Sequence, residues 1–232
     1  MQILSLKNNF LALSFVVFTS LTGGVLTACS TTTSENPSPN TTATQTSDSP
    51  VDSHGGMHHG GMDHAMDLGP ADASYDLRFI DGMIVHHQGA VDMAKEVQEK
   101  SQRPELKQLA AEMITAQNKE IAQMQQWRTA WYPNAGDKPM AYHAQMNHMM
   151  EMTPEQKQAM MMSMDLGAAD AEFDLRFING MIPHHEGAVV MAEDALQKSQ
   201  RPEMKQLAQE IIKTQDAEIN QMKQWRQAWY NK

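Results

Sequence analysis

A double histidine flanked by methionines occurs twice in this sequence and is its most chemically specific feature. Residues 79–94 read FIDGMIVHHQGAVDMA, and residues 177–192 read FINGMIPHHEGAVVMA. Thioether sulfur is a soft donor that suits Cu(I), and imidazole suits copper in either oxidation state. The predicted ligands are Met83, His86, His87 and Met93 in the first copy, and Met181, His184, His185 and Met191 in the second.

A purely structural interpretation gives these residues no ligand role. Methionine often fills gaps in apolar cores, and a buried histidine is often only hydrogen-bonded. For Met93 or Met191 taken singly, core packing is the simpler interpretation. The occurrence of the whole set in two copies favours a metal site.

A glutamate on an otherwise apolar helical face lies downstream of each double histidine. An unpaired buried charge is costly, so Glu120 needs a metal, an arginine such as Arg78, or a histidine as its partner. It would then either bind the ion directly or orient a histidine through the second ring nitrogen. In each copy the methionine is a further predicted ligand, and the glutamine and glutamate are predicted to contact the ligands. The residues are Gln117, Glu120 and Met124 in the first copy, and Gln215, Glu218 and Met222 in the second.

Two further tracts alternate histidine with methionine in a glycine-rich or polar context. A low-complexity linker, or a short helix whose methionines pack on the rest of the protein, would explain part of this pattern. The alternation itself favours capture of copper or silver. The predicted capture ligands are His54, Met57, His58, His59, Met62 and His64 in residues 54–66, and His143, Met146 and His148 in residues 133–163.

The N-terminal residues predict export and a lipid anchor. Lys7 precedes an apolar stretch, and Leu26-Thr27-Ala28-Cys29 matches a bacterial lipobox. Residues 1–28 are therefore a predicted signal peptide, Cys29 the lipidated residue, and residues 29–53 a disordered Ser/Thr/Pro tether. A transmembrane anchor is the alternative, because the apolar run approaches spanning length.

Composition excludes several other classes of protein. Cys29 is the single cysteine, so disulfides and protein thiolate ligands play no part in the folded region. The formal net charge of −10, without a basic stripe, argues against binding to nucleic acid.

The two double histidines belong to a long internal repeat. Residues 66–132 and 164–230 align without a gap and are identical at 45 of 67 positions. Helical periodicity and a Gln-Arg-Pro break predict helices over residues 71–100 and 104–131, and again in the second copy. Two such hairpins cover each other's apolar stripes, which predicts an all-α four-helix bundle with repeats at 67–132 and 164–232. A short helix is expected in the linker after Thr153-Pro154-Glu155.

Helical phase separates an inner from an outer face on the first helix. His86 and Met93 share the predicted inner face, whereas Asp81, Gln88 and Asp92 occupy the outer face. In the second copy Pro183 precedes the double histidine where the first copy has Val85. A proline inside a helix removes a backbone hydrogen bond and typically kinks the helix, so the two copies are expected to present their histidines differently.

The repeats resemble domain-of-unknown-function family 305 through F-I-x-G-M-I-x-H-H-x-G-A-V-x-M-A. The downstream P-E-[LM]-K-Q-L-A and E-I-x-Q-M-x-x-W segments agree. The resemblance implies a ferritin-like helical fold and an exported protein that binds copper through the double histidines and their methionines. Val85 departs from the proline common in the family motif.

The resulting expectation is a non-enzymatic lipoprotein that binds copper, Cu(I) above Ag(I) and Cu(II). It would face the periplasm or the outside of the cell and serve copper buffering, chaperoning or resistance, together with an envelope efflux system. The alternative is a ferritin-like oxidase acting on Cu(I) or Fe(II). Neither repeat contains the Glu-x-x-His motif of di-iron bundles, which disfavours iron but leaves a Cu(I) oxidase open.

Overall fold

The computed structural model describes residues 67–232, and within them the predicted all-α class is confirmed. Helices α2 (Tyr75–Lys100), α3 (Pro104–Trp131), α5 (Phe173–Lys198) and α6 (Pro202–Tyr230) are long, and α4 (Pro154–Met161) is short. A two-stranded sheet of β1 (Met140–His143) and β2 (His148–Glu151) precedes α4. The predicted signal peptide, Cys29, the tether and the first Met/His tract lie outside the described residues.

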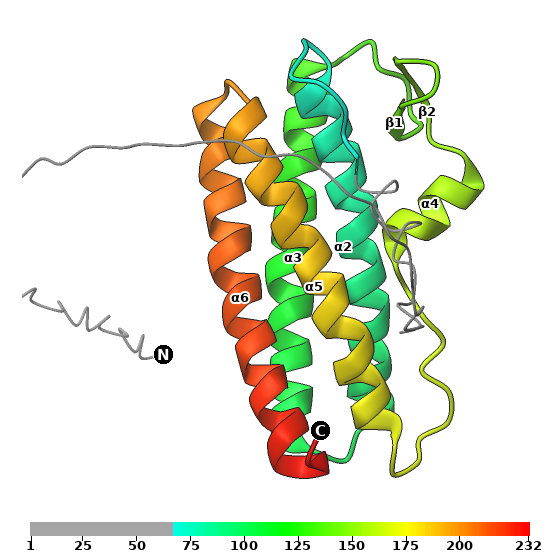
Figure 1. The fold of residues 1–232 in the computed structure, drawn as a ribbon, viewed down its shortest axis with the longest axis vertical. Coiled ribbons are helices and arrows are strands. Elements are labelled where there is room, and N and C mark those ends of the chain that lie inside the picture. The colour runs from blue at the N-terminus through cyan, green and yellow to red at the C-terminus, as the bar shows by residue number, and fades with distance from the viewer. Residues whose placement is uncertain (1–66) are drawn as a thin grey trace, which may run out of the picture. The chain divides into compact units, whose positions relative to one another are not determined.

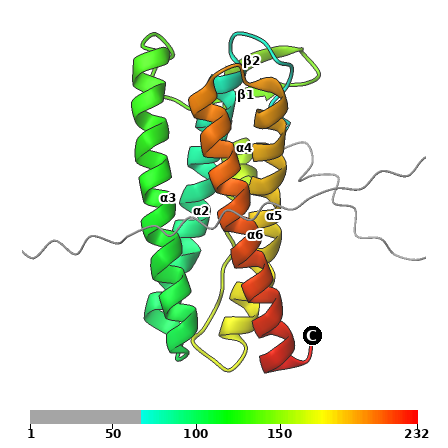
Figure 2. The ribbon, with the colours of Figure 1, turned by 90° about the vertical axis from the view of Figure 1, so that its left-hand side faces the viewer.

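The four long helices are arranged as two helical hairpins, α2/α3 and α5/α6, that lie side by side (Figures 1 and 2). Helix α2 packs along α5, and this contact joins the hairpins. The linker between the hairpins, which carries β1, β2 and α4, contacts α2. None of the helices within residues 67–232 is both long and apolar enough to cross a membrane.

The same short turn joins the helices of each hairpin. The Ser101 hydroxyl accepts a hydrogen bond from the amide of Arg103 at 3.1 Å, and Pro104 opens α3. Ser199 accepts from the amide of Arg201 at 3.2 Å in the second repeat, and Pro202 opens α6. Proline suits this position because the first helical amides have no intrahelical partner. The predicted break is therefore confirmed in both copies.

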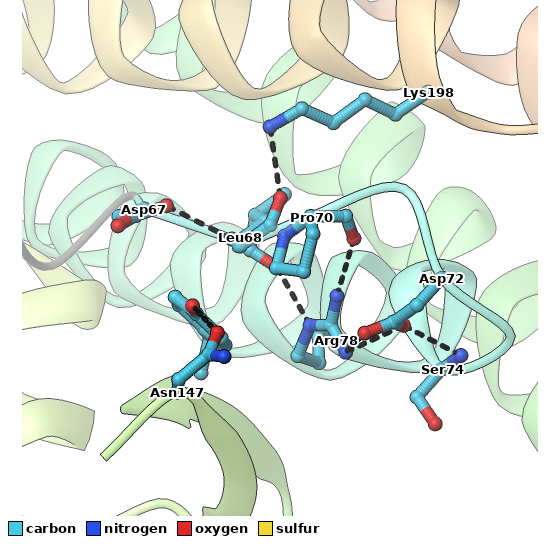
Figure 3. A network of polar contacts seen from close by, with 10 residues as sticks. Asp67, Leu68, Pro70, Asp72, Ser74, Arg78, Asn147 and Lys198 are labelled. Atoms are coloured by element: carbon cyan, nitrogen blue, oxygen red, sulfur yellow. Dashed lines mark hydrogen bonds and ion pairs between the residues drawn. The ribbon is translucent and has the colours of Figure 1, made fainter. Parts of the chain in front are cut away.

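Helix α2 begins at Tyr75 rather than at the predicted Ala71 because Arg78 organises the preceding residues as a loop (Figure 3). The Arg78 guanidinium donates to the carbonyls of Leu68 at 2.6 Å and Pro70 at 2.7 Å, and to the Asp72 carboxylate at 2.9 Å. Arg176 holds the corresponding loop in the second repeat, through the carbonyls of Leu166 and Ala168. Arg78 is thus committed to the loop and does not reach Glu120.

The apolar core consists of two clusters, each containing residues of both repeats. The first cluster combines the N-terminal half of α2 with the C-terminal half of α5, as Phe79 and Ala195 show. The second combines the C-terminal half of α2 with the N-terminal half of α5, as Val97 and Phe177 show. Helices α2 and α5 are therefore antiparallel, and the double histidines, at the middle of each helix, lie between the clusters.

The linker is more structured than the predicted flexible tract. Strands β1 and β2 pair in antiparallel register, with Met140 opposite Glu151 and His143 opposite His148. The short helix predicted after Thr153 is present as α4, where Thr153 and Gln156 form a reciprocal capping box. Met160 is buried against the first apolar cluster, so this part of the linker packs on the helices as the structural alternative expected.

Asp81, expected on the outer face, is instead buried. Its carboxylate accepts hydrogen bonds from the Arg128 guanidinium at 2.6 Å and from the Met140 amide at 2.8 Å. Arg128 also donates to the carbonyls of Gly136 and Lys138. The linker covers this side of α2, whereas Asn179, at the corresponding position of α5, stays exposed. The helical phase was right, but the phase alone does not show that another segment covers that face.

We predict that Asp81→Ala lowers the free energy of unfolding by about 2 kcal/mol. The change leaves the Met140 amide and the Arg128 guanidinium without their acceptor. Asn179→Ala is the matched control in the second repeat and should stay within about 0.5 kcal/mol of the parent, as an exposed substitution does. Urea unfolding followed by circular dichroism measures both, and equal losses would show that the contact does not hold the linker.

Candidate metal centre

The two double histidines meet at the α2/α5 contact. The rings of His86 and His184 have their centroids 3.9 Å apart, and the rings of His184 and His185 are 6.2 Å apart. All four histidine side chains, including His87, are at most 1% exposed. Positions 98 residues apart in the sequence are thus brought together as one buried polar layer.

Each second histidine is held by the glutamate of the following helix. His87 Nε2 lies 2.7 Å from a carboxylate oxygen of Glu120, and His185 Nε2 lies 2.6 Å from one of Glu218. A ring N–H that donates to a carboxylate fixes both the orientation of the ring and the position of its proton. Of the partners considered for Glu120, the structure therefore selects a histidine.

Burial keeps the imidazoles of His86, His184 and His185 neutral. It lowers the pKa of His184 and of His185 to about 3, and neighbouring histidines add to the effect. Burial, together with His184, His87 and His185, also holds the pKa of His86 well below its ordinary value. Burial raises the pKa of Glu218 to about 7, and the negative charges of Glu120 and Glu112 act in the same direction. Neutral imidazole is the form that binds metal.

Several ring nitrogens in this layer have no hydrogen-bond partner among residues 67–232. They are both nitrogens of His86 and the Nδ1 atoms of His87, His184 and His185. A buried polar atom without a partner costs free energy, and such atoms in a native protein call for an explanation. A cluster of neutral imidazoles with free lone pairs fits a soft or borderline cation such as copper.

The carboxylates do not complete a conventional metal site. Across the described part of the chain, no three His, Cys, Asp or Glu side chains are arranged to hold one ion. An ion in this layer would therefore be bound by few nitrogens, by methionine sulfur, or after a small movement of side chains.

The methionines of one repeat do not gather at one site; each apolar cluster contains methionines from both repeats. Met83 and Met93, predicted to share one site with His86 and His87, lie in different apolar clusters. Antiparallel packing of α2 on α5 separates them and groups each with methionines of other helices. One cluster contains Met83, Met124 and Met191, and the other contains Met93, Met181 and Met222. Thioethers therefore lie on both sides of the histidine layer.

Gln117 and Gln215 are buried without contacting the histidines. Each is 3% exposed, and the Oε1 atom of each has no hydrogen-bond partner in the described residues. The expected hydrogen bond to a histidine is absent, because Glu120 and Glu218, one turn further along, take that place. The two amide oxygens add to the unpaired polar atoms of the interior.

The two copies are not equivalent, and the linker accounts for part of the difference. His184 Nε2 lies 3.0 Å from the carbonyl oxygen of Met161, whereas neither nitrogen of His86 is engaged. A Cβ atom on Gly89 would lie 1.8 Å from the same carbonyl, so a glycine is required there. Helix α5 continues through Pro183. Sequence reasoning missed the Met161 carbonyl because a backbone group carries no residue-type signal.

The remaining predicted ligands divide into described and undescribed residues. His143 and His148 face each other across the end of the β1/β2 hairpin, with Met146 in the turn between them. This group is part of the linker and is separate from the buried histidine layer. His54, Met57, His58, His59, Met62 and His64 lie outside the described residues.

We predict that two neighbouring substitutions affect the stability of the metal-free protein differently. His86→Leu removes two unpaired buried nitrogens at similar volume and should change the free energy of unfolding by less than about 1 kcal/mol, or increase it. His87→Leu leaves the Glu120 carboxylate without its donor and should cost about 1–3 kcal/mol. Urea unfolding in the presence of a chelator measures both values. A larger loss for His86→Leu would show that the structure misses a partner of His86.

We also predict a pH-dependent difference between the parent protein and His184→Gln. Below pH 6.5 the unfolded chain protonates His184 but the folded chain does not, so lowering the pH removes the contribution of His184 from the stability of the parent alone. His86 and His185 act in the same way in both proteins. The stability difference between the two proteins should shift against the parent by about 1.4 kcal/mol for each pH unit between 6 and 4. Glu218, whose raised pKa acts in the opposite direction, is present in both proteins and cancels. A pH-independent difference in urea unfolding would show that His184 titrates normally.

Comparison with known proteins assigns the family. The family described as "Domain of unknown function (DUF305)" matches residues 24–128 and 76–226. A curated relative, "Uncharacterized protein L153" of Acanthamoeba polyphaga mimivirus, is 45% identical over 49 residues. That match spans 21% of this chain and 32% of the relative, so it covers about a third of the relative's length.

Solved structures of the same family are similar over nearly all of their own length. The protein CopM in its Cu(II)-bound form is 42% identical with a TM-score of 0.54, and in its Cu(I)-bound form 39% identical with a TM-score of 0.52. Each match covers 67% of this chain and 97% of CopM. A DUF305 fragment from Deinococcus radiodurans is 30% identical with a TM-score of 0.52, over 66% of this chain and 95% of the fragment. The chain therefore belongs to the DUF305 family, and it is similar to CopM, which has been solved with copper bound.

Proposed function

We propose that this protein binds Cu(I), and also Ag(I) and Cu(II), as an exported lipoprotein that buffers or transfers copper at the cell envelope. The observation that carries the proposal is the layer of four buried histidines, in which five ring nitrogens lack a partner within residues 67–232. Copper is cargo in this proposal and is bound and released without chemical change.

The similarity to CopM supports the choice of metal. CopM is described in Cu(I)-bound, Cu(II)-bound and Ag-bound forms, and the chain is 38–42% identical to these structures. Cu(I) and Ag(I) prefer soft donors, and the methionine thioethers on either side of the histidine layer are soft donors. Neither the site nor the comparisons support the oxidase alternative.

The histidines and the glutamates have different roles in the proposed copper binding. The neutral histidines need not lose a proton before they bind a cation, because burial lowers the pKa of His184 and His185 to about 3. Glu120 and Glu218 fix the rings of His87 and His185 and leave their Nδ1 lone pairs free. Exchange between imidazole and thioether donors requires no catalytic group, so we assign no enzymatic activity.

The remaining parts of the proposal rest on the sequence. Lipidation at Cys29 would anchor the protein to a membrane, residues 30–53 would tether it, and the Met/His tract of residues 54–66 would capture ions. An envelope efflux system would receive them. We further propose that the two hairpins form a ferritin-like four-helix bundle that arose by duplication, as the identity between the repeats suggests.

We predict that replacing the four buried histidines removes the tightest copper component. Residues 30–232 and a variant with His86, His87, His184 and His185 changed to alanine are titrated with Cu(I) in competition with a chromogenic chelator. The parent should show a tight component that the variant lacks, and the Met/His tracts should give weaker binding in both. Saturating Cu(I), at about 100 times the dissociation constant, should stabilise the parent by about 2.7 kcal/mol.

Two controls make this result interpretable. His86→Leu, expected to fold normally, should weaken the tight component without loss of helicity in circular dichroism. Oxygen consumption measured with Cu(I) and with Fe(II) tests the oxidase alternative, and sustained turnover would replace the binding proposal by an enzymatic one. Identical titration curves for the parent and the four-histidine variant would place copper binding outside the histidine layer.

A further inference from the structure

The end of the β1/β2 hairpin gathers potential metal donors away from the buried histidine layer. His143 and His148 are directly opposite in the antiparallel register, and their rings lie nearly parallel with centroids 6.5 Å apart. Met146, in the turn that joins the strands, is 51% exposed. Two imidazoles and one thioether thus share one end of a single hairpin.

The hydrogen bonding of the pair leaves lone pairs available. His148 Nδ1 lies 3.2 Å from the carbonyl oxygen of Met146, so Nδ1 carries the proton and donates it. Nε2 of His148 is then the nitrogen with the free lone pair, an arrangement common among metal-binding histidines. His143 Nδ1 is buried and makes no hydrogen bond to any residue from 67 to 232. Neither histidine forms a hydrogen bond or an ion pair with a carboxylate in the described chain.

Hydrogen bonds hold the backbone that carries these donors. The Met146 amide donates to the His143 carbonyl at 3.1 Å, and the Tyr142 hydroxyl donates to the Asn147 side chain at 2.6 Å. Asn147 has a φ of 50°, in the left-handed region that asparagine tolerates. Asp81 accepts from the Met140 amide and so fixes the base of the hairpin to α2. Pre-organisation of this kind lowers the entropic cost of binding.

We propose that His143, His148 and Met146 form a second binding site, for a single soft monovalent cation such as Ag(I) or Cu(I). At a centroid separation of 6.5 Å, the two imidazoles are near enough to bind one ion through metal–nitrogen bonds of about 2 Å. The nearly parallel rings must rotate to do so, because the lone pairs lie in the ring planes. The donor set is small and contains sulfur but no carboxylate, which suits a soft ion of low coordination number and not Zn²⁺ or Mg²⁺. Met146 and His148 are exposed and His143 is half-buried, whereas the histidine layer is fully buried.

This site goes beyond the proposed function because it requires none of the buried histidines. In the alternation of β2, Met149 points to the opposite face of the hairpin from His148. Met149 pairs with Tyr142, whereas His148 pairs with His143. Met149→Leu is therefore a matched control for Met146→Leu, with the same chemical change at a neighbouring residue.

The test follows the ring nitrogens directly. The purified protein, labelled with ¹⁵N at histidine, is titrated with Ag(I), and the resonances are assigned from His143→Gln and His148→Gln. We expect His143 and His148 to shift together along one binding curve. Met146→Leu should raise the Ag(I) concentration at half-saturation about tenfold, equivalent to about 1.4 kcal/mol, and Met149→Leu should leave it unchanged.

Several outcomes would overturn the proposal. A shift of His148 without His143, no shift of either at saturating Ag(I), or equal effects of Met146→Leu and Met149→Leu would each contradict a shared site. The resonances of His86 and His184 report the buried layer in the same titration. A hairpin that responds while the buried layer stays silent would contradict the proposed function and leave this inference standing, and the reverse result would do the opposite.

Discussion

The structure depends on the burial of four imidazoles between two apolar clusters. An imidazole without a hydrogen-bond partner is costly to bury, and the layer contains several unpaired ring nitrogens within the described residues. The apolar clusters on either side compensate for this cost, since each includes large side chains from both repeats. The same cost would favour the proposed binding of a cation here, because a cation that engages the lone pairs recovers part of the lost free energy.

The two similar segments of the sequence each contribute one double histidine, and the linker makes the two unequal. Antiparallel packing of α2 on α5 brings His86 against His184, so a single hairpin would hold only half of the layer. The linker then contacts α2 and places the Met161 carbonyl beside His184. Asp81 and Arg128 hold the linker there. In the second repeat Arg226 donates a longer hydrogen bond, 3.3 Å, to the side-chain oxygen of the exposed Asn179.

Helical periodicity and the Gln-Arg-Pro breaks predicted the helix class and most helix boundaries, because apolar spacing and proline act locally. The start of α2 was misplaced because Arg78 draws the preceding residues into a loop, and no local signal shows where a guanidinium will reach. Pairing of β1 with β2 and the burial of Asp81 were missed for a similar reason, since both depend on segments that meet only in the folded chain. The residue types at the site were predicted, but their grouping was not: whether Met83 joins Met93 or Met191 depends on the direction of α5 relative to α2.

The position of the carboxylates is consistent with the reversible copper binding that we propose for the histidine layer. Glu120 and Glu218 accept hydrogen bonds from the Nε2–H groups of His87 and His185, so each ring is held in place while its Nδ1 atom has no partner among the described residues. Carboxylates bound directly to the ion would favour harder cations and tighter, slower exchange. Because they instead contact imidazoles, an ion bound as we propose would meet histidine nitrogen and methionine sulfur rather than carboxylate oxygen. Glu218 also carries a raised pKa near 7 through burial and its proximity to Glu120, which limits the negative charge held beside the layer when no cation is present. The interior is thereby matched to a soft cation of low charge.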